Sequence, residues 1–209
     1  MILNREAVAA MLLGAARLLS EHSDRLCEID SRFGDGDHGI TMNKIARLIT
    51  GQVPQWGDRS IPAFLEDLGM AAMEVRGGSA GPLYGALISG LGVLLEEDEN
   101  ELDEGGLRRM FAGILQELGD ITTAKVGDKT MMDALIPAVE AAQFAEGDIR
   151  AILTAAADAA QAGAKASEGF VAKFGRARSY KEQTIGTPDA GAVSASLFIR
   201  GLAEGAGAL

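Results

Sequence analysis

Three aspartates and one histidine lie within nine consecutive positions, separated mainly by glycines, just ahead of an apolar run with helical spacing. They are Asp30, Asp35, Asp37 and His38. Carboxylates this close repel one another unless a cation lies among them. Oxygen-rich sites suit Mg²⁺ or Ca²⁺, and Mg²⁺ in proteins usually accompanies phosphate groups. The residue types and their spacing therefore favour a site for a nucleotide and magnesium.

Two better-known motifs do not fit this segment. Gly34, Gly36 and Gly39 match the dinucleotide-binding spacing G-x-G-x-x-G. That fingerprint needs a preceding strand, whereas the residues ahead of it look helical. A calcium EF-hand starting at Asp35 would need an oxygen ligand where Gly39 stands and a glutamate where Ala46 stands.

The alternative for the aspartates is a solvated turn, because Asp and Gly are common turn residues. Three carboxylates together with an imidazole ahead of a helix favour the metal site over that alternative. The role of His38 stays open, since its ring could contact a phosphate, cap the next helix or bond a backbone carbonyl.

Two further breaks in the helical pattern could bind phosphate. Residues 76–82 could wrap a phosphate with backbone N–H groups and the Ser79 hydroxyl, or could be a flexible link between helices. Residues 175–191 begin with a cationic cluster that includes Arg176. Arginine suits phosphate through forked hydrogen bonds, and the alternative is a surface loop.

A fourth break covers residues 122–130 and lacks the adjacent Gly-Lys pair of a Walker P-loop. Lys129 and Met131 there either begin a helix with a buried methionine face or lie near a nucleotide. Methionine fills irregular apolar gaps, which is compatible with both interpretations.

The elements that must position these breaks are helices. Apolar residues recur at helical spacing along most of the chain, strand signals are nearly absent, and about eight helices follow. Ser60, Asp103 and Asp189 are the expected N-cap residues. The four breaks fall at helix edges. Four such connections at one end of a bundle would form a pocket of backbone N–H groups that attracts anions.

Composition limits the class of protein. The 209 residues are 47% hydrophobic and carry a net charge of −11. Such an acidic chain is a poor candidate for binding nucleic acid or an anionic membrane. Cys27 is the single cysteine, which excludes an internal disulfide and fits a reducing cytoplasm. No apolar run approaches the length that crosses a bilayer.

The four breaks, taken together and in order, resemble the ADP-binding L subunit of dihydroxyacetone kinases, equivalent to the nucleotide-binding domain of the single-chain enzymes. The set spans nearly the whole chain and is specific, although each fragment alone is weak. The matching pieces are residues 34–39 (Gly-Asp-Gly-Asp-His-Gly), 77–85 (ending in Gly-Pro-Leu-Tyr-Gly), 127–131 (Gly-Asp-Lys-Thr-Met), 175–178 (Gly-Arg-Ala-Arg), 185–186 (Ile-Gly) and 189–191 (Asp-Ala-Gly).

Two of these regions depart from the family pattern. Residues 189–191 read Asp-Ala-Gly where the family often has Asp-Pro-Gly. Residues 179–183 read Ser-Tyr-Lys-Glu-Gln where the family often has Tyr-Leu-Gly-Glu-Arg, so one arginine is missing. The metal motif is intact.

The resemblance implies an all-α barrel of about eight antiparallel helices, formed by a single domain over residues 1–209, with ADP or ATP at one end. It implies that Asp30, Asp35 and Asp37 bind two Mg²⁺ ions, which bridge the nucleotide phosphates. Further residues that it places around the nucleotide are His38, Gly39, Ile40, Thr41, Gly78, Ser79, Ala80, Thr122, Met131, Arg176, Asp189, Ala190 and Gly191.

The resemblance also implies an enzyme subunit that is active only with a partner. A separate K subunit would hold the ketose through a histidine of its own, and this chain would supply the nucleotide. ADP would stay bound and be rephosphorylated by a phosphotransferase-system protein. The alternatives are exchange of free ATP, another short ketose such as erythrulose, a non-catalytic nucleotide-loaded binding module, or a helical scaffold with structural calcium. Contact between two copies stays open.

Overall fold

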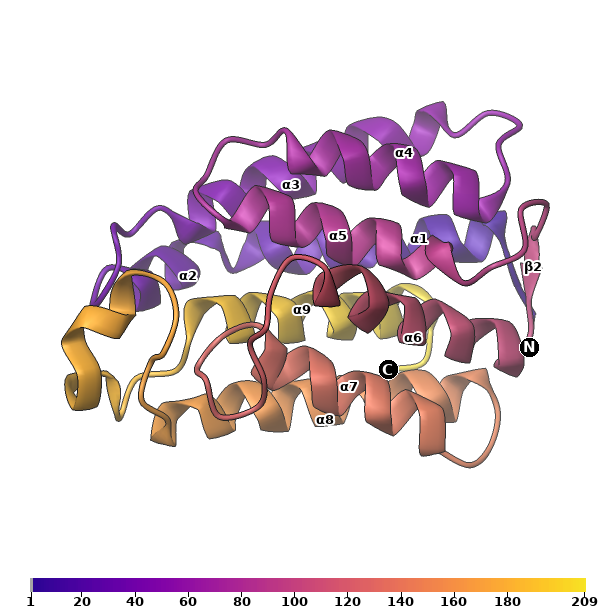
Figure 1. Cartoon of the computed structure of the whole chain (residues 1–209). Coiled ribbons are helices and arrows are strands. Elements are labelled where there is room, and N and C mark those ends of the chain that lie inside the picture. The colour runs from indigo at the N-terminus through magenta and orange to yellow at the C-terminus, as the bar shows by residue number, and fades with distance from the viewer. Residues whose placement is uncertain (1) are drawn as a thin grey trace.

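A computed structural model describes residues 2–209, which form nine α-helices and little other regular structure (Figure 1). Two-residue strands β1 (Leu3–Asn4) and β2 (Glu101–Leu102) and three short 3₁₀ helices, η1 (Val53–Gln55), η2 (Ser167–Gly169) and η3 (Arg176–Thr184), complete it. The α-helices are α1 (Arg5–Glu21), α2 (Ser23–Asp30), α3 (His38–Gln52), α4 (Ile61–Met73), α5 (Ala80–Val93), α6 (Glu104–Gly119), α7 (Met132–Phe144), α8 (Ile149–Ala166) and α9 (Ala190–Gly205).

Eight of the helices described in residues 2–209 close into a ring. From α1 the ring passes through α3, α4, α5, α6, α7 and α8 to α9, and α9 packs back against α1. Neighbours in the ring run in opposite directions (Figure 1). The short α2 lies at one end, and the antiparallel pair of β1 and β2, with Leu3 opposite Leu102, lies at the other. The predicted all-α barrel is confirmed.

Small residues let α1 and α9 pack closely where the ring closes. A Cβ atom added at Gly201 would lie 2.4 Å from the Cα of Ala15, and one added at Gly14 would lie 2.2 Å from the carbonyl oxygen of Gly201. No side chain fits at either glycine, because real Cβ contacts are longer. Around this crossing the core consists of buried aliphatic residues and a few aromatic ones.

The two ends of the barrel differ in how their helices begin. At the far end, each helix starts with a side chain that accepts a hydrogen bond from its first turn, and these N-caps are Asn4, Ser60, Asp103 and Asp148. At the opposite end, Asp189 caps α9 and the Thr130 hydroxyl accepts from the first N–H of α7 at 3.2 Å, whereas α3 and α5 begin without any side-chain bond. Uncapped N–H groups need another partner. The end that carries the four glycine-rich breaks is therefore the end with free donors.

The caps at Ser60, Asp103 and Asp189 confirm the sequence prediction at those positions. Among the helices between residues 2 and 209, none is both long and apolar enough to span a membrane.

Candidate functional site

A cavity of about 670 Å³ opens where the N-termini of α3, α5, α7 and α9 converge. Its size is typical of pockets for small ligands and cofactors. Residues from all four glycine-rich breaks line it, so the structure brings together the segments that the sequence singled out. Each helix N-terminus carries a partial positive charge, and four of them at one cavity favour an anionic ligand.

The three aspartates lie together on one wall. Asp30 is the last residue of α2, and Asp35 and Asp37 follow in the turn before α3. One carboxylate oxygen from each lies within 4.8 Å of the other two. The N–H of Gly36 donates to Asp30 Oδ2 at 2.8 Å, and Gly36 has a φ of 74°, which favours glycine. Three converging carboxylates fit a divalent cation that prefers oxygen ligands.

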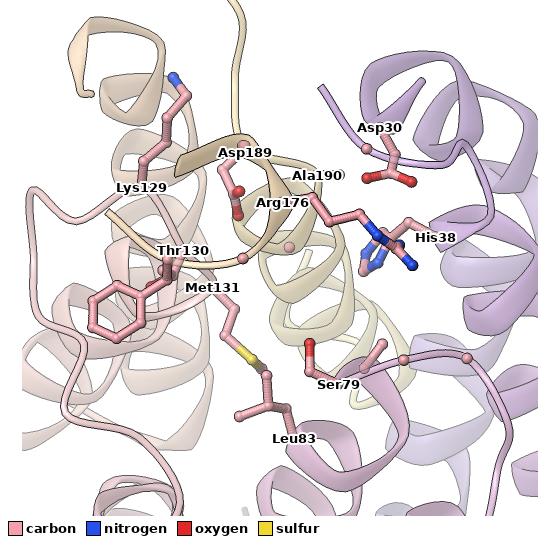
Figure 2. A pocket seen from close by; sticks show the side chains of 18 of the residues that line it. Asp30, His38, Ser79, Leu83, Lys129, Thr130, Met131, Arg176, Asp189 and Ala190 are labelled. Atoms are coloured by element: carbon pink, nitrogen blue, oxygen red, sulfur yellow. The ribbon is translucent and has the colours of Figure 1, made fainter. Parts of the chain in front are cut away.

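Arg176 partly neutralises this cluster. Its Nη1 forms an ion pair with Asp35 Oδ2 across the cavity mouth, and Figure 2 shows its guanidinium reaching toward the wall that carries Asp30 and His38. Burial raises the pKa of Asp37, and the neighbouring carboxylates of Asp35 and Asp30 raise it further. The charges in this wall are therefore not balanced by the protein alone.

His38 joins the acidic wall to α9. Its Nε2 lies 2.8 Å from the Ser194 hydroxyl, which itself donates to the carbonyl oxygen of Gly191 at 3.0 Å. Ser194 has one proton to donate, so its oxygen accepts from His38 and the imidazole carries hydrogen on Nε2. Burial lowers the pKa of His38, which keeps the ring neutral near pH 7. The contact with Ser194 was not among the three roles left open, and the backbone of Ala190 also acts on the ring as a hydrogen-bond partner that raises its pKa.

The loop before α5 forms the floor of the cavity. Gly77 packs on Thr41, whose Oγ1 would lie 2.0 Å from any Cβ at that glycine. Gly78 has a φ of 61° and nothing within 4 Å of its Cβ position. Ser79 and Ala80 then line the cavity and begin α5 without a side-chain cap. The loop thus exposes backbone N–H groups to whatever occupies the cavity.

Three predicted residues at the start of α3 do not line the cavity. Gly39 is buried against the carbonyl of Ser23, Thr41 is buried behind Gly77, and Ile40 is 54% exposed away from the cavity. The other predicted site residues all line it, namely Asp30, Asp35, Asp37, His38, Gly78, Ser79, Ala80, Thr122, Met131, Arg176, Asp189, Ala190 and Gly191.

The wall opposite the aspartates is largely apolar. Thr130 and Met131 lie on this side, and Leu83 lies below them (Figure 2). Sequence reasoning did not single out several apolar or aromatic residues that line the cavity, although an apolar residue beside a glycine-rich break is a weak signal for them. The additional lining residues are Phe33, Leu83, Tyr84, Ile121, Met132, Phe174 and Pro188.

Buried polar contacts hold this apolar wall in shape. The Asp133 carboxylate, fully buried, accepts from the N–H groups of Gly127 and Thr130, both at 2.6 Å. The Lys129 ammonium donates to the carbonyl oxygens of Ser167 and Thr187 at 2.5 and 2.6 Å. Lys129 has a φ of 61°, a strained value for a residue with a side chain. The loop before α7 is thus tied to the segment that precedes α9.

Asp189 closes the site at the start of α9. Its Oδ2 accepts from the N–H of Ala192 at 2.7 Å, and burial raises its pKa to about 7. Ala190 and Gly191 follow it along the cavity lining. Asp189 therefore satisfies its own helix, whereas α3 and α5 begin without a capping side chain.

Known proteins resemble this chain in sequence and in fold. The DAK2 domain pattern matches residues 32–204. The PEP-dependent dihydroxyacetone kinase 2, ADP-binding subunit DhaL, of Listeria innocua is 35% identical over 193 residues, covering 90% of this chain and 88% of that protein. The D-erythrulose kinase of Mycolicibacterium smegmatis is 33% identical over 206 residues, covering 94% of this chain and 35% of that protein.

A solved structure agrees with these relatives. The dihydroxyacetone kinase from C. freundii in complex with AMP-PNP and Mg²⁺ superposes with a TM-score of 0.68 and 28% identity, covering 94% of this chain and 33% of that chain. This chain therefore spans about a third of the two longer kinases and most of the Listeria subunit.

Proposed function

The chain belongs to the DAK2 domain family, and on this premise we propose that it is the nucleotide-binding subunit of a dihydroxyacetone kinase. One observation carries the proposal. Three carboxylates whose oxygens lie within 4.8 Å share a cavity with the uncapped N-termini of α3 and α5. The carboxylates suit a divalent cation and the helix termini suit phosphate, so the same cavity accommodates both halves of a magnesium–nucleotide complex.

Asp30, Asp35 and Asp37 would hold Mg²⁺, and two ions are proposed from the family resemblance. Magnesium would supply neutralisation of the phosphate charge, which lets a protein of net charge −11 bind a polyanion. The C. freundii kinase was crystallised with AMP-PNP and Mg²⁺, which supports this choice of cofactors. The protein's own part is to fix the carboxylates, as the bond from Gly36 to Asp30 does.

The remaining lining residues would contact different parts of the nucleotide. The N–H groups around Gly78, Ser79 and Ala80 would bind the phosphates, and Arg176 would add a cationic fork. Thr122 and Met131, on the apolar side with the Asp189–Gly191 turn, would contact the nucleoside. Phosphoryl transfer depends mainly on such positioning and charge stabilisation, so no general base is required from this chain.

A partner subunit would supply the ketose. The match to 88% of a protein named as an ADP-binding subunit supports a separate ketose-binding K subunit. Exposed apolar side chains on the loops around the cavity end support docking there, among them Ile121, Phe174, Tyr180 and Ile185. The word PEP-dependent in the Listeria protein's name supports retained ADP that a phosphotransferase-system protein rephosphorylates.

A second candidate is the same role in a kinase for another short ketose. The M. smegmatis relative is a D-erythrulose kinase and matches this chain at 33% identity. Both candidates predict the same nucleotide chemistry here, because the ketose would bind to the partner. A side-by-side turnover assay with dihydroxyacetone and erythrulose separates them.

Reconstitution tests the proposal. Native mass spectrometry of the purified protein is expected to show bound ADP or ATP with Mg²⁺. The isolated chain should phosphorylate no ketose, and adding the K partner should restore turnover. Asp37→Asn should abolish that turnover, whereas Asp158→Asn, at an exposed position on α8, should not. Robust turnover by the isolated chain, or full activity of Asp37→Asn, would contradict the proposal.

A further inference from the structure

The Tyr84 hydroxyl is a buried donor without a partner. Tyr84 lies on α5, one turn beyond Ala80, and is 1% exposed. Its ring packs edge-on against Phe198 of α9, with centroids 6.0 Å apart, while the residue also lines the cavity. Among residues 2–209 its hydroxyl is one of two buried side-chain polar atoms that lack a hydrogen bond. Buried polar groups in native proteins are nearly always bonded, so this exception calls for a ligand or water.

The polar groups beside Tyr84 are already engaged. Ser194 gives its single proton to Gly191 and accepts from His38 Nε2. Burial raises the pKa of Tyr84, and the Ser194 hydroxyl opposes that rise as a hydrogen-bonding neighbour, although the geometry of the two hydroxyls does not meet the criteria for a hydrogen bond. Because that pKa lies above its ordinary value, the phenol is protonated near pH 7. What Tyr84 lacks is an acceptor.

The position of the hydroxyl indicates which acceptor is missing. Tyr84 lies in the second turn of α5, and its neighbours Ser194 and Phe198 lie in the second and third turns of α9, so it is buried below two helix N-termini. An anionic oxygen is the acceptor that helix N-termini favour. The loop at Gly78 and Ser79, with its unengaged N–H groups, borders the same part of the cavity. Tyr84 therefore lies on the same side of the cavity as the loop that we propose binds phosphate.

We propose that the Tyr84 hydroxyl donates a hydrogen bond to a phosphate oxygen of the bound nucleotide, directly or through one trapped water. The inference rests on the proposed function, since it names a further binding residue for the same ligand. It differs from a purely structural role in one respect. A hydroxyl that bonds only the ligand contributes nothing to the fold when the ligand is absent, and its burial then disfavours the folded state.

The variant Tyr84→Phe separates the ligand-binding role from a purely structural one, because the two roles predict opposite changes in the unfolding midpoint of the ligand-free protein. In ligand-free protein the unfolding midpoint should stay equal or rise, because an unsatisfied polar group has been removed. Calorimetric titration should show the dissociation constant for Mg–ADP rising about fivefold or more, with the same factor for Mg–pyrophosphate. Tyr180→Phe is the matched control. Tyr180 is the only other tyrosine of the sequence, and it is exposed and lies outside the cavity lining. This variant should change neither quantity.

The outcomes that overturn the inference are distinct. A lowered ligand-free midpoint with unchanged affinity would show that Tyr84 simply bonds Ser194. Weaker binding of Mg–ADP with unchanged binding of Mg–pyrophosphate would move the contact to the nucleoside. If the unmutated protein binds neither compound, the proposed function fails, whatever Tyr84 does.

A second measurement avoids replacing Tyr84. In the Tyr180→Phe background Tyr84 is the only tyrosine, so protein labelled with ¹³Cζ-tyrosine gives a single NMR signal. The Cζ resonance should shift when Mg–pyrophosphate is added, because the hydroxyl gains an acceptor. An unchanged resonance at saturation overturns the inference even if the phenylalanine variant folds poorly.

Discussion

Arg176 of η3 forms an ion pair with Asp35, a member of the carboxylate cluster that would hold magnesium. The same carboxylate cannot serve the guanidinium and a metal ion equally well. The pair is exposed, with 67% of the Arg176 side chain and 39% of the Asp35 side chain accessible. Exposed pairs contribute little, so a divalent cation can displace the arginine, which is then free to contact phosphate.

Arg176→Gln should therefore change two affinities in opposite directions. Without nucleotide, Mg²⁺ should bind up to about fivefold more tightly, because a competing cation has been removed. With Mg²⁺ present, ADP should bind more weakly, because a phosphate ligand has been lost. Calorimetric titrations measure both, with the exposed Arg178→Gln as control. Parallel changes in the two affinities would contradict this role.

Asp128→Asn should destabilise the fold in a pH-dependent way. Asp128 is 4% exposed and accepts from Lys173 Nζ at 2.7 Å and from the Lys125 N–H at 3.0 Å. The hydrogen bond from Lys173 lowers the pKa of Asp128 below its ordinary 3.8, and burial opposes that change. A depressed carboxyl pKa stabilises the folded state above the unfolded-state value, and this contribution is lost as the pH falls through the folded-state value.

Denaturant unfolding should then show Asp128→Asn less stable than the unmutated protein by about 1–2 kcal/mol at pH 7. The difference should be constant from pH 5 to 8 and shrink below about pH 4. A difference that persists undiminished at pH 3 would mean that the ionised carboxylate is not the source of the stabilisation.

Lys181→Gly should stabilise the protein. Lys181 has φ 50° and ψ −128°, a conformation that only glycine adopts without strain, and it stands where the family pattern often has glycine. Strain of this kind costs about 1–3 kcal/mol, and the extra freedom of glycine in the unfolded chain offsets part of it. A net gain of about 1 kcal/mol in the free energy of unfolding is expected. Lys181→Ala keeps a Cβ atom and should give none.

Gly201→Ala should destabilise the ring closure. The added methyl would lie 2.4 Å from the Cα of Ala15, and backbone rather than a flexible side chain would have to move. The expected cost is about 1–3 kcal/mol in the free energy of unfolding. Gly119→Ala is the control, because no atom lies within 4 Å of its Cβ position at the end of α6. Equal stability of the two variants would contradict tight packing of α1 on α9.

Much of this architecture follows from patterns that are local in sequence. Stripes of apolar residues predicted the helices, and capping side chains such as Ser60 predicted where helices begin. The sequence indicated that the four polar breaks would form a pocket if they met at one end of the bundle, and the residues that line the cavity show that they do meet. Alternating helix directions make this outcome natural, because connections in an antiparallel ring fall only at two ends.

Contacts between distant residues could not be predicted in the same way. His38 and Ser194 are 156 positions apart, and nothing local in either segment indicates their hydrogen bond. Of the predicted run from His38 to Thr41, only His38 lines the cavity, for a geometric reason. Successive residues of a helix point about 100° apart, so His38 faces the cavity while Ile40 faces outward.

The unequal capping of the two barrel ends has a consequence for amide hydrogen exchange. The first turns of α1, α4, α6 and α8 are capped by side chains, whereas those of α3 and α5 have no capping side chain. In ligand-free protein, amide hydrogens at the cavity end of the barrel should therefore exchange fastest. Binding of Mg–ADP should slow exchange selectively at that end. The barrel would act as a rigid scaffold, and the first turns at its cavity end would be fully hydrogen-bonded only when the nucleotide is bound.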